Sequence, residues 1–476
     1  MGYKAIVDIL ALKDLKRRAV EFADRYNPDL PTVMLAPGGM GSRLLKTVQR
    51  YESGVAFPEQ PTYQKIWLSF GAILHGDHVG LRMTHGVHDR GDKPVIPSGE
   101  VSSRLAKKYD NTAEYFNGDS SVFPANYIVF GYDWRKLPRV GAAYLRQFLL
   151  FLRDETAHLG LADPRPRTTL LGHSQGGLVI KLFLNDLVDG GEDPDDWLER
   201  FISVGTPFYG TQNHHSRYYV GVKLLNFFSP GGRPTLTDLI WTLPGPYVLL
   251  PAPRSVLEPR LSQLGLNRYP VVDTDNQTLE VDPFASGQRS RLPGFMTSPQ
   301  QNLTFTVLRL GAAAQEAAQV DRELPSIADR IFHIRSTLRE SQSPLSLRVR
   351  WKNVDGANYD LNDGDDPIST NGGDSDGTVP LWSARLAWTP DDQVFMFKGL
   401  KHGGLAEHPD VLDAIAAIIQ GETVDLPTVS TELEIASEAD AMSLLEEVRT
   451  GNLDLEELSI QPAAIQRRFE AMLELV

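Results

Sequence analysis

The chain has 476 residues, a formal net charge of −14 and no cysteine. The missing cysteines exclude disulfides, thiolate metal sites and a cysteine nucleophile. The acidic charge argues against nucleic acid and anionic membrane surfaces as partners. The longest apolar stretch, residues 239–253, is interrupted by prolines and is too short to cross a bilayer. The first residues lack the pattern of a secretory signal, so we expect a cytoplasmic protein whose contact with lipid is apolar and transient.

A helix is predicted over residues 10–26 and a strand over residues 33–36. The strand opens into a glycine-rich loop, residues 37–44. A plain turn made by these glycines is one reading of the loop.

Histidines are concentrated in one later segment, where four of the 11 lie within 14 residues, beside two aspartates. Imidazole and carboxylate groups together make a plausible zinc set. The spacing fits no closed zinc motif, however, and surface loops collect such residues for other reasons. The acidic run 360–366 invites calcium, but it lacks the spacing and the final glutamate of an EF-hand. We therefore expect no metal and no cofactor. The four histidines are His75, His78, His85 and His88.

The pattern G-x-S-x-G occurs around Ser174, within the sequence Leu-Gly-His-Ser-Gln-Gly-Gly of residues 171–177. A predicted strand, residues 168–171, precedes it, and an amphipathic helix, residues 178–187, follows. This context is typical of a nucleophile elbow, in which small neighbours allow a strained serine at a sharp bend. The helix N-terminus then offers N–H groups to developing negative charge, first that of Gln175. A glycine-rich turn without chemistry is the alternative. In α/β-hydrolases a glycine-rich loop after an earlier strand, as in residues 37–44, supplies the second N–H group of the oxyanion hole, and the backbone N–H of Met40 is our candidate for it.

An insertion of more than 100 residues separates the strand predicted to end near Val204 from the strand predicted near Ile331. α/β-Hydrolases carry caps and lids at this position. The insertion contains proline-spaced aromatic and aliphatic residues, as in 239–251, which suit the lining of an acyl groove under a mobile lid. Ordinary packing of a cap on the sheet is the alternative.

An acid and a histidine follow in the chain order of an α/β-hydrolase, which is serine, acid, histidine. Asp376 is preferred to Asp374, because a glycine and a threonine after Asp376 form a tight turn that can direct its carboxylate inward. His402 lies in a loop before two glycines, whereas His408 precedes a proline that begins a predicted helix. We therefore prefer His402 to His408. A neutral His402 can take the proton of Ser174 if a buried carboxylate orients its ring.

Landmark motifs recur in order across about residues 31–420. They are residues 37–42, 66–68, 131–135, 172–176, 205–211, 249–251 and 376–380, with His402 last. This set resembles the lecithin:cholesterol acyltransferase family, which includes lysosomal phospholipase A2 and phospholipid:diacylglycerol acyltransferases. The resemblance implies an α/β-hydrolase core that moves an acyl group from a lipid ester onto a serine and then to an alcohol or water. By position it names Ser174, Asp376 and His402, and the N–H groups of Met40 and Gln175.

Two features of the family bear on further expectations. Its animal members are secreted or lysosomal and carry a disulfide, so a sterol acceptor is not expected for a chain without cysteine. Trp67 resembles by position the family's membrane-facing loop, and a buried structural tryptophan is the alternative.

The predicted fold class is α/β, an α/β-hydrolase with a mostly parallel central sheet, helices on both faces and an inserted cap. The predicted function is serine-dependent hydrolysis or O-acyl transfer on phospholipid-like esters. One alternative is a carboxylesterase or lactonase for a smaller, non-lipid ester, and another is an inactive hydrolase fold that binds lipid or protein. The predicted parts are an N-terminal helical extension (1–30), a first core segment (31–211), a cap (212–327), a second core segment (328–420) and an acidic helical C-terminal extension (421–476).

Overall fold

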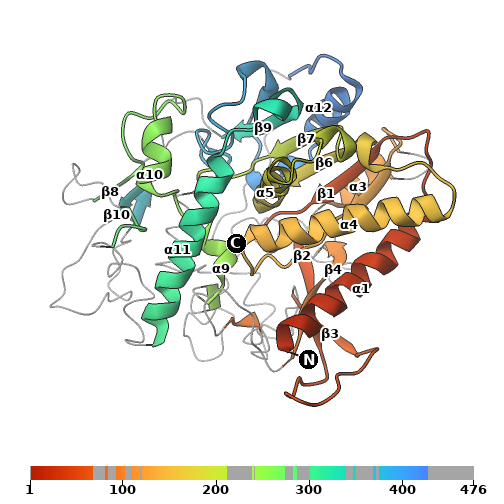
Figure 1. The fold of residues 1–476 in the computed structure, drawn as a ribbon. Helices are drawn as coiled ribbons and strands as arrows, with labels where there is room; N and C mark the ends of the chain where they lie inside the picture. The colour runs from red at the N-terminus through yellow and green to blue at the C-terminus, as the bar shows by residue number, and fades with distance from the viewer. Residues whose placement is uncertain are drawn as a thin grey trace, which may run out of the picture.

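The computed structural model describes residues 2–67, 81–83, 93–101, 109–117, 121–211, 239–240, 242–273, 282–286, 301–338, 347–349, 368–370 and 375–426. A six-stranded parallel sheet lies at its centre, in the order β12-β9-β7-β6-β1-β5 (Figure 1). The strands are β1 (Thr32–Ala36), β5 (Asn126–Val129), β6 (Thr168–His173), β7 (Arg200–Val204), β9 (Ile331–Thr337) and β12 (Val394–Lys398).

Both faces of this sheet are buried. In β1, Met34 packs into one hydrophobic cluster, whereas Val33 and Leu35 pack into another. Successive side chains of a strand point to opposite faces, so the two clusters lie on opposite sides of the sheet. This double burial explains why the strands read as nearly continuous apolar runs.

Helices cover the two faces (Figure 1). On one face α4 (Pro138–His158) packs on α5 (Gln175–Asp189), and α1 (Tyr3–Ala23) packs on α4. The other face is covered by α3 (Asp110–Phe116) and α12 (Pro409–Gln420). The predicted α/β class, with a parallel central sheet and helices on both faces, is confirmed.

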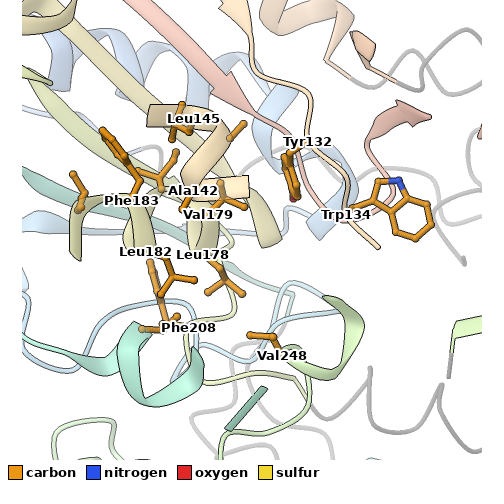
Figure 2. Packing of buried hydrophobic residues seen from close by; sticks show 14 of the residues in the cluster. Tyr132, Trp134, Ala142, Leu145, Leu178, Val179, Leu182, Phe183, Phe208 and Val248 are labelled. Carbon is orange, nitrogen blue, oxygen red and sulfur yellow. The ribbon is translucent and has the colours of Figure 1, made fainter. Parts of the chain in front are cut away.

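The helix α5 is buried along almost its whole length. It approaches α4 closely because Gly141 of α4 has no side chain, and a Cβ there would lie 3.1 Å from both γ-carbons of Val179. Figure 2 shows Leu178 and Leu182 of α5 directed toward Phe208, away from α4. Packing on several sides holds this helix, and with it the turn at its N-terminus, in one position.

The helix α1 begins earlier than the predicted 10–26. The carboxylate of Asp8, in the second turn, accepts a hydrogen bond of 2.6 Å from the Tyr144 hydroxyl of α4. With its charged group satisfied by α4, the first turns join the helix and bury apolar residues such as Ile6 and Leu10. The helix packs on the core through α4.

Two smaller sheets accompany the central one. One is antiparallel, in the order β3-β2-β4, and the other has the order β11-β10-β8. Their strands are β2 (Ser42–Thr47), β3 (Tyr63–Trp67), β4 (Val95–Val101), β8 (Val271–Asp273), β10 (Leu347–Val349) and β11 (Ile368–Thr370).

The described part of the predicted cap contains α9 (Pro244–Tyr247), α10 (Arg254–Leu257) and α11 (Gln301–Asp321). α11 packs against α5. Leu243, Tyr247 and Leu250 are buried in the main cluster, which favours ordinary packing for these residues of 239–251. The limits of the cap, 212–327, and of the C-terminal extension, 421–476, stay predictions, because 212–238 and 427–476 lie outside the described residues. No helix in the described ranges combines the length and apolarity needed to cross a membrane.

Candidate active site

Ser174 occupies the sharp turn between β6 and α5 with φ 51° and ψ −126°, a strained conformation for a residue with a side chain. The turn is possible because its neighbours are glycines. A Cβ on Gly176 would lie 2.1 Å from the carbonyl oxygen of Ala36, and a Cβ on Gly172 would lie 2.6 Å from Cα of Gly177. The strand–turn–helix context predicted for this segment is therefore present.

Three side chains from distant parts of the chain form a hydrogen-bonded series at this turn. Ser174 Oγ lies 3.0 Å from Nε2 of His402, and Nδ1 of His402 lies 2.7 Å from Oδ2 of Asp376. These segments meet at the carboxyl ends of the parallel strands, near the ends of β6 and β9 and in the loop after β12. The spacing allows a proton to pass from the serine to the imidazole while the carboxylate holds the ring.

The carboxylate of Asp376 is fixed by backbone groups of its own turn. Its side chain is 2% exposed, and Oδ1 accepts hydrogen bonds from the N–H groups of Thr378 (3.0 Å) and Val379 (2.7 Å). The backbone N–H of His402 donates to the carbonyl oxygen of Asp376 at 2.9 Å. One oxygen is thus committed to the turn, and Oδ2 faces the imidazole.

His408 and Asp374 are the alternatives to His402 and Asp376. Nδ1 of His408 accepts a hydrogen bond of 3.3 Å from the N–H of Asp410, so His408 caps α12. This is the helix-entry role expected from the proline that follows it. Asp374 lies outside the described residues. Of the two candidate histidines, the structure places His402 beside Ser174.

A glycine packs against the bond between the imidazole and the carboxylate. Gly205 follows β7 with φ 56°, and a Cβ on it would lie 3.1 Å from Nδ1 of His402 and 3.2 Å from Oδ2 of Asp376. Both the positive φ and the short approach require glycine here. The backbone of this residue therefore forms one wall of the site.

The glycine-rich loop lies directly on the elbow. A Cβ on Gly38 would lie 3.1 Å from Cβ of Ser174, and a Cβ on Gly39 would lie 2.8 Å from the side-chain oxygen of Gln175. Gln175 is the first residue of α5, where an N–H group has no partner within the helix. Met40 has φ 64°. The two predicted oxyanion-hole donors thus belong to segments in contact at Ser174.

Trp67 is buried, with 3% of its surface exposed. Its indole N–H donates to the carbonyl oxygen of Met40 at 2.7 Å, and its ring lies 5.1 Å from that of Trp134. The structure therefore places Trp67 in the core behind the glycine-rich loop. The reading of Trp67 as a membrane-facing side chain is wrong, and the alternative of a buried structural tryptophan holds.

A buried ion pair lies beside Trp134. Nη2 of Arg135 lies 2.7 Å from Oδ2 of Asp133, and both side chains are almost fully buried. Burial alone would raise the pKa of Asp133, but Arg135 and Lys136 outweigh it and lower this pKa to about 2. Since the carbonyl oxygen of Arg135 accepts from the N–H of Gly245 at 2.8 Å, the pair also fixes the loop that meets α9.

Two residues at the site were missed by sequence reasoning. The hydroxyl of Tyr109 lies 2.9 Å from the N–H of Gly38 and 2.6 Å from Nδ1 of His173. Nε2 of His173 lies 3.1 Å from the carbonyl oxygen of His402. His173 lies within the serine motif, so its position was a signal, but no sequence pattern distinguishes Tyr109.

No metal site can be assigned. Within the described ranges, no three histidine, aspartate or glutamate side chains gather as a metal would need. His75, His78, His85 and His88 lie outside those ranges, and so does the acidic run 360–366.

Comparisons with known proteins agree with the fold and the motifs. Residues 120–226, which include the elbow, match the family model named lecithin:cholesterol acyltransferase. The crystal structure of a Tle4–Tli4 complex is similar with a TM-score of 0.52 and 14% identity, over 82% of this chain and 98% of that chain. A Bacillus licheniformis lipase, BlEst2 in mature form, gives a TM-score of 0.29 and 11% identity, over 83% of this chain and 94% of that one. No curated protein sequence matches.

The expected α/β-hydrolase fold is therefore confirmed, and the family resemblance is confirmed over residues 120–226. The family match and the hydrogen-bonded serine, histidine and aspartate together indicate a serine hydrolase or acyltransferase of the lipid-ester class.

Proposed function

We propose that the chain hydrolyses or transfers the acyl group of phospholipid-like esters through an acyl-enzyme on Ser174. The observation that carries the proposal is the series from Ser174 Oγ through His402 to Asp376, with spacings of 3.0 and 2.7 Å. The strained backbone of the serine adds to it, since such strain gathers at functional sites. The lipid class of the ester rests on the family match of residues 120–226.

In the first half of the reaction, Ser174 Oγ attacks the ester carbonyl carbon while Nε2 of His402 accepts the hydroxyl proton. The negative charge that develops on the carbonyl oxygen is stabilised by the N–H groups of Gln175 and Met40. Asp376 stabilises the imidazolium that forms. His402 then gives its proton to the leaving alcohol as the ester C–O bond breaks, which leaves the acyl group on the serine.

The second half repeats these steps with a different nucleophile. His402 takes a proton from water or from an acceptor alcohol, whose oxygen attacks the acyl-enzyme. The bond to Ser174 Oγ breaks, and the serine regains its proton from the imidazole. Water gives a free fatty acid, whereas an alcohol gives a new ester.

We propose that the protein meets lipid through transient apolar contact. The net charge of −14 disfavours attraction to anionic surfaces. Because Trp67 is buried behind the glycine-rich loop, side chains other than Trp67 make this contact.

The test is to incubate the purified protein with a fluorophosphonate probe, with phospholipid vesicles and with short p-nitrophenyl esters, each with and without a long-chain alcohol. Labelling of Ser174 with release of fatty acid or a new ester from the vesicles supports the proposal, and the alcohol arm separates hydrolysis from transfer. Ser174→Ala is the control, expected to fold and to lose both labelling and turnover.

Two results would contradict the proposal. Turnover of short esters alone would favour a carboxylesterase or lactonase. An unlabelled, inactive wild-type protein would favour a binding protein on a hydrolase fold.

A further inference from the structure

Backbone strain, seen as positive φ angles at non-glycine residues, gathers around the candidate active site. Among the residues that the structure describes, the non-glycine residues with positive φ are Met40 (64°), Tyr109 (72°) and Ser174 (51°). Each costs conformational energy and persists only where the surroundings enforce it. Met40 and Ser174 belong to the proposed machinery. Tyr109 shares the strain, and its side chain reaches the same place.

The hydroxyl of Tyr109 joins the glycine-rich loop to the elbow. It accepts a hydrogen bond of 2.9 Å from the N–H of Gly38. Its own proton can then be donated to Nδ1 of His173, which lies 2.6 Å away. Complete burial raises the pKa of the Tyr109 phenol, so the group stays protonated and able to donate.

His173 continues the connection to the histidine loop. When Nδ1 of a neutral imidazole accepts a hydrogen bond, the proton lies on Nε2. Nε2 of His173 then donates to the carbonyl oxygen of His402 at 3.1 Å. The His173 and His402 rings are 5.0 Å apart. The chain of hydrogen bonds therefore runs from Gly38 through Tyr109 and His173 to the backbone of His402.

We infer that Tyr109 and His173 are positioning residues that hold the glycine-rich loop and the His402 loop at fixed positions around Ser174. The inference rests on the proposed function and assigns it two further residues. Oxyanion-hole donors are effective only if they are in place before charge develops. The Tyr109 hydroxyl fixes the loop two residues before Met40, and His173 fixes the backbone that carries the imidazole. Their effect is expected in the transition state rather than in substrate binding.

Tyr109→Phe is the first test, because it removes the hydroxyl and keeps the ring. It leaves the N–H of Gly38 and Nδ1 of His173 without this partner. We expect kcat for a p-nitrophenyl ester to fall roughly ten- to a hundredfold, with KM nearly unchanged. Tyr115→Phe is the matched control, since Tyr115 lies on α3, which begins directly after Tyr109, and its hydroxyl donates to Asp413 of α12 at 2.6 Å. It should lose a similar amount of stability and keep its kcat.

Two substitutions of His173 separate its two bonds. In His173→Asn the amide oxygen can take the place of Nδ1 and accept from Tyr109, whereas in His173→Gln the amide nitrogen can take the place of Nε2 and donate to the His402 carbonyl. Each should lose part of kcat. Tyr109→Phe and His173→Gln break the same bond, so the double variant should lose less than the product of the two single losses.

The outcomes are distinct. A lower kcat in Tyr109→Phe with unchanged KM, normal kcat in Tyr115→Phe and a non-multiplicative double variant would support the inference. Wild-type kcat in Tyr109→Phe, an equal loss in Tyr115→Phe, or a change in KM alone would overturn it while the proposed function stands. An inactive, unlabelled wild type would defeat the proposed function, and the inference with it. If Tyr109→Phe does not fold, the two His173 variants decide, and wild-type kcat in both would overturn the inference.

Discussion

Gly205→Ala isolates the contribution of backbone shape to the bond between His402 and Asp376. The new Cβ would lie 3.1 Å from Nδ1 of His402 and 3.2 Å from Oδ2 of Asp376. These distances are a few tenths of an ångström shorter than ordinary contact, and the 2.7 Å hydrogen bond is the contact that can lengthen. The substitution also places alanine at φ 56°, which costs about 1–2 kcal/mol in folding stability.

The strain and the contact can be measured separately. Gly191 has φ 67° and no atom within 4 Å of an added Cβ, so Gly191→Ala carries the strain without the contact. Both variants should lose about 1–2 kcal/mol of unfolding free energy in urea. A charge-assisted hydrogen bond contributes about 1.5–3 kcal/mol. Its weakening should therefore lower kcat of Gly205→Ala roughly ten- to a hundredfold, while Gly191→Ala keeps wild-type kcat.

The assay is steady-state hydrolysis of a p-nitrophenyl ester, with the rate of fluorophosphonate labelling as a second measure of serine reactivity. Wild-type kcat in Gly205→Ala would show that the site relaxes around the methyl group, and the argument from the short contact would be wrong. An equal loss of kcat in Gly191→Ala would show that general destabilisation, rather than the contact, lowers activity.

Three further predictions concern single groups. His402→Ala should lose nearly all turnover and His408→Ala, which removes a helix cap, should lose about 1 kcal/mol of stability and little turnover; similar ester hydrolysis rates in the two would reverse the choice of base. Asp376→Asn should lower kcat by roughly 10⁴. The amide oxygen of the asparagine must accept from the two N–H groups of the turn, so its NH₂ faces Nδ1 of His402 and leaves the imidazole proton on Nε2, where the base cannot accept a proton from Ser174. A kcat within tenfold of wild type would exclude this orienting role. Burial raises the pKa of Glu316 to about 8, although the backbone N–H and the charge of Arg139 act to lower it. Between about pH 4.5 and 8 the carboxyl group is therefore protonated in the folded state and ionised in the unfolded state, so the folding stability falls as the pH rises across that window. Glu316→Gln should remove this fall, giving a variant equal to wild type at pH 4.5 and more stable at pH 8 in urea unfolding, and parallel curves for the two proteins would refute the assignment.

Motifs with a strict local geometry could be predicted from the sequence. The G-x-S-x-G pattern places Ser174 between a strand and a helix, because a Cβ at either glycine would collide with backbone atoms of Ala36 or Gly177. His402 could be preferred to His408 because a proline after His408 marks the start of a helix. These signals depend on residues close together in the chain.

Contacts between distant segments could not be predicted in this way. Tyr109 has no motif around it, and its hydrogen-bond partner Gly38 lies 71 residues away in the chain. The first turns of α1 precede the predicted start at residue 10, and they are held by a contact between Asp8 and Tyr144, which lie 136 residues apart in the chain. The burial of Trp67 also depends on a distant segment, because its indole N–H donates to the carbonyl oxygen of Met40.

The position of His402 after the sheet's edge strand has a consequence for protein synthesis. The serine and its base lie 228 residues apart in the chain, and β12, which leads to the histidine, is the last of the described strands of the sheet to be made. At about 5–20 residues per second, a ribosome exposes the elbow many seconds before it supplies the imidazole. A nascent or interrupted chain that stops before His402 therefore carries a serine hydroxyl without its base, and the protein acquires its chemistry only after the His402 loop has been made.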